Sequence, residues 1–504
     1  MAGYLLGYDV GSSSVKAALL DVDTGAPVAS ATSPEKEMAI SAPQPGWAEQ
    51  HPELWWEQVI KATRKLRQRG AADLKRVQAV GISYQMHGLV VVDKNRRVLR
   101  PAIIWCDSRA VGIGEQAWRE IGPQRCLTRL LNSPGNFTAS KLKWVQLHEP
   151  DIFSRIDKVM LPGDYIALRL SGEIRTTPSG LSEAILWDYQ KQGLADLLLD
   201  YYGLPGSLLP QVVPSFSIQG QVSAAAAEEL GLEQGLPVAY RGGDQPNNAF
   251  SLNVLGPGEI AATAGTSGVV FAVGTRAAYD PKSRVNTFVH VNHSAALPRY
   301  GILLCLNGTG ALYSWLRRLL SSGGGICDYE AMNRQAAEVP IGAGGLVVLP
   351  YGNGAERTLE NRTLGALIQG LEFNLHQGPH LLRAAQEGIV FALNYGLQIM
   401  KEMGLEVRTV RAGRTNMFQS ALFGEAFATA TGTPVELYNT DGAQGAARGA
   451  GLGAGIYKDF KEAFRGLKAV SSLEPEAGKI APYQEAYERW LAALRARLAQ
   501  EGRV

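Results

Sequence analysis

The sequence predicts an α/β protein of two large lobes. Three observations lead to this prediction: the length of the chain, its mixture of strand-like and helix-like segments, and a motif that begins each half. A chain of 504 residues is too long for one hydrophobic core, so two large domains with a cleft between them are expected. The composition, with 46% hydrophobic and 19% charged residues, is that of a globular protein rather than a disordered chain.

The first part of the chain mixes both kinds of segment. Residues 5–10 and 15–22 are apolar enough to form strands, and the small polar residues 11–14 between them predict a tight turn. Residues 55–66 carry apolar side chains at helical spacing, and residues 77–83 again resemble a strand. This mixture indicates an α/β lobe.

A stretch of glycine and proline near the middle marks the predicted domain boundary. A short strand at residues 237–240 runs into residues 242–246, where glycines and a proline stop regular structure. Residues 258–273 then repeat the opening arrangement of strand, small-residue loop and strand, which indicates a weak internal duplication. We therefore expect an N-terminal lobe over residues 1–247 and a C-terminal lobe over residues 248–504.

Two later segments are predicted to serve packing. The glycine- and alanine-rich residues 442–455 are typical of a helix that approaches its neighbours closely. Residues 483–500 form an amphipathic helix, and its apolar stripe includes Trp490 and Leu494.

Charge and cysteine content limit the expected partners and compartment. Lys and Arg number 49 against 47 Asp and Glu, which leaves a formal charge of +2 without a long basic run. We therefore expect a small-molecule partner, no nucleic acid and no membrane. The four cysteines are widely spaced, and neither a leader-like start nor an apolar run of bilayer length is present. A cytoplasmic protein is expected.

Two loops have the composition of phosphate-binding loops. Asp9 ends the first strand and is followed by Gly11 and by Ser12, Ser13 and Ser14. Backbone N–H groups and hydroxyls of this kind can cradle phosphate, while the acid holds Mg²⁺ through water. Lys16 could add positive charge. Residues 265–268, Gly-Thr-Ser-Gly, are the counterpart in the second half. Each loop alone could be an ordinary turn, but two together favour a nucleotide clamp.

Rival nucleotide and metal signatures are poor. The sequence has no Gly-x-x-x-x-Gly-Lys-Ser/Thr motif and no His-Glu-x-x-His motif. The Gly-x-Gly-x-x-Ala run at residues 449–454 has no acid at the distance that a dinucleotide site requires. These absences disfavour an NAD-dependent sugar dehydrogenase and a metal held only by protein ligands, so any metal is expected to arrive with ATP.

Several motifs together resemble the FGGY carbohydrate kinase family over nearly the whole chain. Residues 46–52 are similar to its early Gly-Trp-x-Glu segment, and residues 105–109 to its Trp-x-Asp-x-Arg element. Residues 141–144 match the core of the first family signature, and residues 366–387 follow the second.

The sequence departs from the family pattern at two places near the expected nucleotide site. Gln386 stands where the second signature usually has an apolar residue, and Arg411-Ala412-Gly413 replaces the customary glycine triplet near the adenine.

The resemblance implies two actin-like (ribonuclease H-like) ATPase lobes with a central inter-lobe cleft, and phosphorylation of a small sugar or polyol by ATP and Mg²⁺. Residues 85–88 and 47–50 most resemble xylulose kinases, which implies conversion of D-xylulose to D-xylulose 5-phosphate. Tyr84 and residues 244–248 depart from that pattern. Glycerol, another pentulose, a polyol or a heptulose therefore stays open as the acceptor, as does a non-catalytic actin-like sensor of sugar or ATP. A homodimer is also kept open.

The same resemblance implies the site residues. Asp244 is the implied catalytic base, although its local sequence alone would suggest a turn or capping aspartate. His87 and Trp47 would likewise be structural residues without the motifs around them. The implied substrate contacts are Met86, His87, Asp244, Gln245 and Trp47. The implied cofactor contacts are Gly11, Ser12, Ser13, Lys16, Gly265, Thr266, Gly310, Gly413 and Asn416, and the implied Mg²⁺ residue is Asp9.

Overall fold

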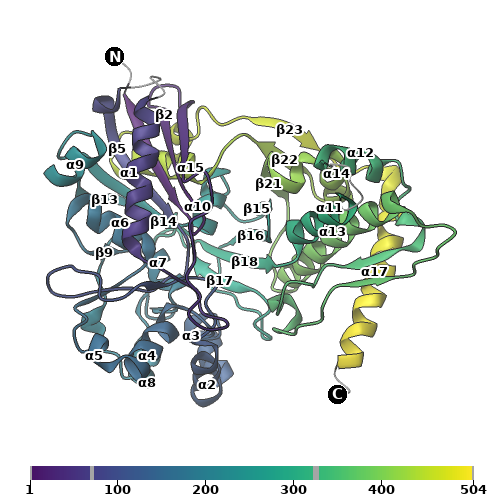
Figure 1. Cartoon of the computed structure of the whole chain (residues 1–504), viewed down its shortest axis with the longest axis horizontal. Helices are drawn as coiled ribbons and strands as arrows, with labels where there is room; N and C mark the ends of the chain where they lie inside the picture. Colours follow the sequence, from purple (N-terminus) through teal and green to yellow (C-terminus); the bar gives the residue numbers. More distant parts are fainter. Residues whose placement is uncertain (1–2, 69–72, 322–327, 502–504) are drawn as a thin grey trace. The chain divides into compact units, whose positions relative to one another are not determined.

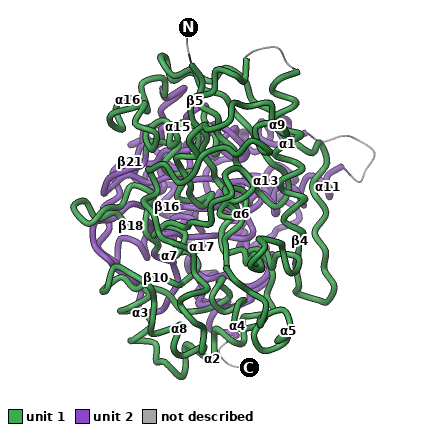
Figure 2. The backbone as a smooth tube through the Cα atoms, turned by 90° about the vertical axis from the view of Figure 1, so that its left-hand side faces the viewer, with its two compact units in different colours: residues 1–253, 288–300, 440–467 green, residues 254–287, 301–439, 468–504 purple. Residues whose placement is uncertain are grey.

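The computed structural model describes residues 3–68, 73–321 and 328–501, and Figure 1 labels its helices and strands. The chain divides into two compact units, each assembled from separate stretches of sequence (Figure 2). Unit 1 comprises residues 1–253, 288–300 and 440–467, and unit 2 comprises residues 254–287, 301–439 and 468–504. The functional division expected at residues 247 and 248 stays a prediction.

Unit 1 is built on a six-stranded sheet in the order β13-β14-β5-β1-β2-β3. Strand β1 is antiparallel to β2 and parallel to β5, and β5 is parallel to β14. Because parallel strands run the same way, the carboxyl ends of β1, β5 and β14 meet at one edge, where open α/β sheets usually bind ligands. The strands are β1 (Tyr4–Val10), β2 (Val15–Asp21), β3 (Pro27–Ser33), β5 (Val77–Tyr84), β13 (Phe216–Gln221) and β14 (Pro237–Gly243).

Helices cover both faces of this sheet. Because successive residues of a strand point to opposite faces, neighbouring residues of β1 contact different helices. The Tyr8 hydroxyl hydrogen-bonds Thr63 Oγ1 of α1 (Pro52–Gln68) at 2.7 Å. On the other face, a Cβ added at Gly7 would lie 1.9 Å from the backbone oxygen of Ala443 in α15 (Gly442–Gly453). Only glycine permits this approach, so the close packing predicted for residues 442–455 is confirmed.

The other helices of unit 1 surround the sheet or form a smaller group beside it (Figure 1). They are α2 (Val111–Ile121), α3 (Pro123–Leu130), α4 (Thr138–His148), α5 (Pro150–Phe153), α6 (Pro162–Ser171), α7 (Pro178–Glu183), α8 (Asp196–Tyr202), α9 (Ala224–Leu230), α10 (Asp244–Ser251) and α16 (Phe460–Ala463).

The second sheet has seven strands in the order β17-β18-β16-β15-β21-β22-β23. Strand β15 is antiparallel to β16 and parallel to β21, so the same local theme returns. The strands are β15 (Glu259–Ala264), β16 (Gly268–Gly274), β17 (Asn286–Val289), β18 (Tyr300–Leu306), β21 (Thr409–Gly413), β22 (Val435–Tyr438) and β23 (Ala469–Leu473).

Unit 2 places its longest described helix, α13 (Gly378–Glu402), in a large apolar core. The last helix, α17 (Ile480–Glu501), contributes Trp490, which is 1% exposed and donates a hydrogen bond from Nε1 to the Val348 oxygen at 3.0 Å. The packing role predicted for its apolar stripe is confirmed. The remaining helices are α11 (Thr309–Ser321), α12 (Tyr329–Ala337) and α14 (Ala421–Thr431).

Five two-stranded ladders complete the strands. They pair β4 (Glu49–Gln50) with β7 (Ala102–Ile103), β6 (Val90–Val92) with β8 (Lys158–Met160), β9 (Arg175–Thr176) with β12 (Gln211–Val212), β10 (Trp187–Asp188) with β11 (Gly193–Leu194), and β19 (Val347–Leu349) with β20 (Leu367–Gln369). Across residues 3–68, 73–321 and 328–501, no helix has the length and apolar character needed to cross a bilayer.

Candidate active site

The carboxyl edge of the unit 1 sheet carries the first predicted phosphate loop. Gly11 N donates to the Ser14 oxygen at 3.0 Å, which closes the turn between β1 and β2. Gln50 Nε2 donates to the Ser12 oxygen at 2.7 Å, and Trp105 Nε1 to Ser12 Oγ at 3.2 Å. Ser13 lies exposed at the tip of the turn. Side chains from outside the loop thus fix Ser12 by hydrogen bonds, and the loop lies at the edge of the sheet.

Asp9 lies inside β1, directly before this loop. Its Oδ1 accepts a hydrogen bond from Ser83 Oγ of β5 at 2.7 Å, and a Cβ added at Gly442 would lie 2.4 Å from its Oδ2. Desolvation raises the pKa of Asp9 above its usual value, against the Ser83 hydrogen bond. The fold therefore brings the Asp9 carboxylate against the start of α15, and among the described residues no cation lies within salt-bridge distance of it. Such a carboxylate is suited to bind a cation.

Asp244 begins α10, immediately after β14 ends at Gly243. Burial raises the pKa of Asp244 to about 7, and the negative charge of Asp9 adds to the effect. Hydrogen bonds from Gln245 act in the opposite direction. A carboxylate with a pKa near neutrality can accept a proton from a substrate and release it again.

Lys16 and Asp441 form an ion pair beside Asp9. Lys16 Nζ lies 2.7 Å from Asp441 Oδ2, and the other carboxylate oxygen of Asp441 accepts from Gln444 N at 2.9 Å, capping α15. Asp441 raises the pKa of Asp9, whereas Lys16 lowers it. Sequence reasoning missed Asp441, because an acid before a glycine-rich segment gives no sign that it folds back beside residue 9, more than 400 positions earlier.

Met86 and His87 follow β5 at the same edge. Met86 is 4% exposed, and a Cβ added at Gly243 would lie 2.6 Å from its Cγ, so Met86 contacts the residue that precedes Asp244. His87 has a positive φ of 61°. This strained backbone is typical of residues that a binding site fixes in place.

Glu183, at the end of α7, holds the His87 backbone and ring. His87 N donates to Glu183 Oε2 at 2.9 Å, and His87 Nδ1 lies 2.9 Å from the Glu183 carbonyl oxygen. That carbonyl can only accept, so Nδ1 carries a proton, and in the neutral ring Nε2 is then the acceptor nitrogen. Burial raises the pKa of the Glu183 carboxyl well above its usual range. Nothing in the local sequence of Glu183 pointed to this role.

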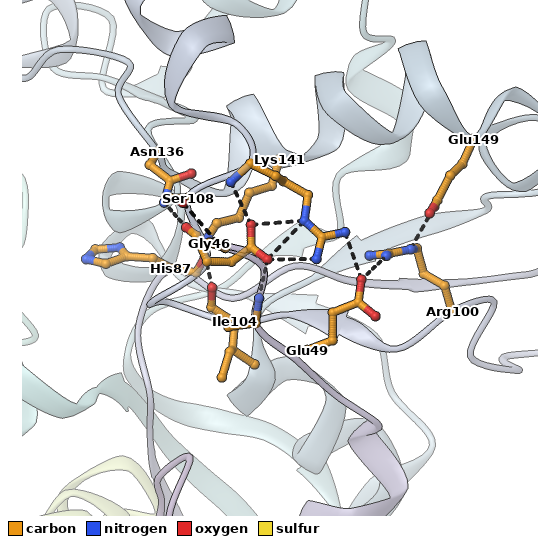
Figure 3. Close-up of polar contacts among 12 residues, drawn as sticks. Gly46, Glu49, His87, Arg100, Ile104, Ser108, Asn136, Lys141 and Glu149 are labelled. Atoms are coloured by element: carbon orange, nitrogen blue, oxygen red, sulfur yellow. Dashed lines mark hydrogen bonds and ion pairs between the residues drawn. The ribbon is translucent and has the colours of Figure 1, made fainter. Parts of the chain in front are cut away.

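A buried lysine, Lys141, also holds the His87 backbone (Figure 3). Lys141 Nζ of α4 donates to the carbonyl oxygens of His87 and Ile104, both at 2.9 Å. Burial lowers the pKa of Lys141 to about 7, while the nearby Asp107 acts in the opposite direction. The lysine of the first signature motif thus ties the His87 backbone to the loop that carries Asp107.

A chain of ion pairs links Asp107, Arg109, Glu49, Arg100 and Glu149, and Figure 3 labels the last three of these residues. Arg109 NH2 lies 2.7 Å from Asp107, and its NH1 lies 2.7 Å from Glu49. The Arg109 guanidinium also lies 3.8 Å from the centre of the Trp47 ring. The rings of Trp47 and Trp144 are nearly perpendicular, with their centres 5.2 Å apart. Trp47 is therefore a partly exposed ring supported by a cation on one face, an arrangement compatible with either a packing role or a sugar contact.

The second predicted phosphate loop lies in unit 2, between β15 and β16. Gly310 N at the start of α11 donates to the Gly265 oxygen at 2.8 Å, and Ala311 N donates to the Thr266 oxygen at 3.1 Å. A Cβ added at Gly310 would lie 2.4 Å from the Gly265 oxygen, so glycine is needed for this contact. Asn416 Nδ2 lies 3.4 Å from the place where a Gly265 Cβ would be.

A cavity of about 330 Å³ opens beside this loop. Tyr313 and Tyr329 stack in its wall with ring centres 5.9 Å apart. Gly413 ends β21 and is not among the residues that line the cavity in the described part of the chain. The lining residues are Ala264, Gly265, Thr266, Gly310, Tyr313, Ser314, Tyr329, Asn333, Asn416, Met417, Gln419 and Ser420. Of these, Tyr313, Tyr329 and Asn333 come from helices whose sequence predicted nothing about binding.

Each unit thus contains one of the two loops predicted to bind phosphate. Unit 1 gathers Asp9, Asp244, Met86 and His87 at one sheet edge, and unit 2 gathers Gly265, Thr266, Gly310 and Asn416 around a cavity. The chain belongs to the FGGY family of carbohydrate kinases: residues 4–251 match the N-terminal domain of that family and residues 260–456 its C-terminal domain. The family membership predicted from the motifs is confirmed.

Individual relatives are similar over almost their whole length. The chain is 33% identical to the xylulose kinase of Escherichia coli K12, with 95% of this chain and 96% of the relative covered. It is 30% identical to the L-xylulose/3-keto-L-gulonate kinase of the same organism, with 97% and 96% covered. A solved structure of a xyloylose kinase from Brucella ovis superposes with a TM-score of 0.89 at 30% identity, covering 99% and 100%. The two-domain kinase fold is thereby confirmed.

Proposed function

We propose that this chain transfers the γ-phosphoryl group of ATP to a hydroxyl of D-xylulose, giving ADP and D-xylulose 5-phosphate. The observation that carries the proposal is the contact of Met86 with Gly243, which joins the predicted sugar motif to the predicted base, Asp244. The similarity to relatives named xylulose kinases supports the choice of sugar.

The protein's part in this reaction is to accept one proton, to align the sugar hydroxyl with the γ-phosphate, and to stabilise the charge on the phosphates. A new bond forms between the substrate oxygen and the γ-phosphorus as the bond from that phosphorus to the β-phosphate oxygen breaks. The hydroxyl proton moves to Asp244, which is ionised above a pKa of about 7. His87, with Nε2 as its acceptor nitrogen, receives a hydrogen bond from a sugar hydroxyl, and the Met86 thioether packs against carbon.

Mg²⁺ and ATP are assigned to the groups that fit them. Burial raises the pKa of Asp9, and the negative charge of Asp441 adds to this effect, so added positive charge beside the two carboxylates would favour ionised Asp9. Bound Mg²⁺ would neutralise phosphate charge, held by Asp9 through water. Ser12, Ser13 and Gly11 suit phosphate oxygens, as do Gly265, Thr266 and Gly310, and the tyrosine-walled cavity suits the nucleoside. A cytoplasmic location and a homodimer remain predictions from the sequence.

The raised pKa of Asp244 predicts the pH profile. The base must be ionised to accept the hydroxyl proton, so kcat/KM for the sugar should fall as the pH drops through a value of about 7. Because burial and the Asp9 charge both raise this pKa, kcat/KM should fall at a higher pH than it would if the base were an ordinary aspartate. Initial rates across the neutral range measure it. A profile that stays flat into the range of ordinary carboxylates would contradict the assignment.

The pocket around His87 predicts the choice of acceptor. A shorter polyol would leave polar groups of the site without partners, so D-xylulose should exceed glycerol in kcat/KM by roughly a hundredfold or more. His87→Ala should shrink this preference, because the lost hydrogen bond serves the longer substrate. ADP release with D-xylulose, L-xylulose, D-ribulose and glycerol measures both effects.

The control for this experiment is the truncation of an exposed ring, such as Phe373→Ala, whose parent side chain is 91% exposed. Glycerol turnover equal to that of D-xylulose would overturn the substrate assignment. Equal losses for both substrates in His87→Ala would make His87 a scaffold residue. ATP hydrolysis without any response to sugar would favour the sensor alternative.

A further inference from the structure

One buried amide joins three walls of the unit 2 cavity. Gln386 lies in α13, is fully buried at 0% exposure, and makes three hydrogen bonds. Its Nε2 donates to the Tyr313 hydroxyl at 2.8 Å and to Asn333 Oδ1 at 3.0 Å, and its Oε1 accepts from Ser420 Oγ at 2.9 Å. All three partners line the cavity, whereas Gln386 itself does not.

The partners belong to three different elements. Tyr313 lies in α11, Asn333 in α12, and Ser420 caps the start of α14. The Gln386 amide contacts all three partners and uses both of its hydrogens and its oxygen to do so. An apolar side chain would fill the same space without any polar atom to pair. A buried amide costs free energy unless its polar atoms are hydrogen-bonded, so filling space alone does not explain Gln386.

The hydrogen bonds around Gln386 run in one direction from α14 to α12. Ser420 Oγ accepts from Phe423 N at 3.3 Å and donates its own hydrogen to Gln386 Oε1 at 2.9 Å. Gln386 Nε2 in turn donates to Asn333 Oδ1 at 3.0 Å. The Tyr313 hydroxyl also donates to Asn333 Oδ1, at 3.0 Å.

This sequence of bonds determines which atom of Asn333 a ligand can use. With Oδ1 occupied by two donors, the partly exposed Asn333 offers its Nδ2 amide hydrogens to the cavity. A donor in that position suits a ring-nitrogen acceptor of adenine beside the stacked rings of Tyr313 and Tyr329.

We propose that Gln386 is a positioning residue for nucleoside binding, which acts by holding the Asn333 carboxamide with its donor toward the base. The proposal rests on the assignment of this cavity to ATP in the proposed function. It adds that the affinity for the nucleoside part of the ligand depends on an amide that does not touch the ligand.

The test compares Gln386→Met with a matched control on the same helix. Methionine keeps the length of the side chain and removes its polar atoms. Asn394 is also a buried amide of α13, 2% exposed and bonded to the Ala430 oxygen at 3.3 Å. It lies eight residues further on, about 12 Å along the helix axis, so Asn394→Leu removes a buried amide without touching the cavity.

Titration calorimetry with ADP gives the first readout and does not depend on turnover. Gln386→Met should weaken ADP binding by roughly tenfold, a free-energy change of about 1.4 kcal/mol, whereas Asn394→Leu should change it less than about twofold. In kinetic assays KM for ATP should rise by a similar factor, with kcat and KM for D-xylulose unchanged. Unchanged ADP affinity in Gln386→Met, or an equal loss in both variants, overturns the proposal.

A double-mutant cycle with Asn333→Ala tests whether Gln386 acts through Asn333. If it does, Gln386→Met should cost less than about twofold in ADP affinity when Asn333 is already alanine. Independent, additive losses would overturn the mechanism. A wild-type chain that binds ADP but does not phosphorylate D-xylulose would contradict the proposed substrate and leave this test intact, so the two failures can be told apart.

Discussion

Asp244→Asn is expected to lower kcat by roughly two to four orders of magnitude, the usual scale for loss of a general base. The function assigned to Asp244 exists only while the hydroxyl loses its proton, so ADP binding should change little. Asparagine keeps the size of the side chain and removes only its capacity to accept that proton. Single-turnover rates with D-xylulose and ADP titrations measure the two quantities separately.

The stability of the Asp244→Asn variant provides the control. Because folding raises the pKa of Asp244 to about 7, the folded state disfavours the ionised carboxylate relative to the unfolded chain, and that destabilising effect is present above the ordinary aspartate pKa. A neutral amide removes the effect, so the thermal midpoint at neutral pH should be unchanged or higher. Near-normal turnover in a well-folded variant would remove Asp244 from the mechanism.

Asp9→Asn is expected to cause the second largest loss, roughly tenfold to a thousandfold in Mg²⁺-dependent activity. The carboxylate lies beside the serine loop without a salt bridge of its own, so its negative charge is available to metal-bound water. The substitution should also move the pH limb assigned to Asp244 to lower pH, because Asp9 raises the pKa of Asp244. Rates measured against Mg²⁺ concentration and against pH give both results.

Ser83→Ala is the matched control for Asp9. It removes the 2.7 Å hydrogen bond to Asp9 Oδ1 and leaves the charge in place. The Mg²⁺ requirement should therefore persist in Ser83→Ala and be weakened in Asp9→Asn. If Asp9→Asn lowers the thermal midpoint strongly, and the protein that stays folded keeps the normal Mg²⁺ response, Asp9 is a structural cap rather than a metal residue.

Local patterns sufficed to predict the elements at the unit 1 edge. The apolar strands around residues 11–14 form β1 and β2, and residues 77–83 fall within β5. These predictions succeeded because a strand, a tight turn and an antiparallel partner are specified by neighbouring residues. The position of Asp244 directly after a strand followed from the same kind of evidence.

Residues brought in from distant parts of the chain could not be predicted in this way. Asp441 reaches Asp9 only because α15, far along the chain, packs on β1 through the bare backbone of Gly7. Glu183 reaches His87 across 96 positions. Gln386 was recognised as unusual for its position, but its role requires knowing that α11, α12 and α14 surround one cavity.

The identity of the phosphorylated product tests the central claim most directly. The purified chain is incubated with Mg²⁺, ATP and D-xylulose, and the products are followed by phosphorus NMR and mass spectrometry. We expect one pentulose phosphate ester, identified as D-xylulose 5-phosphate, for every ADP formed, and little ADP without the sugar. ADP formation that does not depend on the sugar, or a sugar that emerges without phosphate, would contradict it.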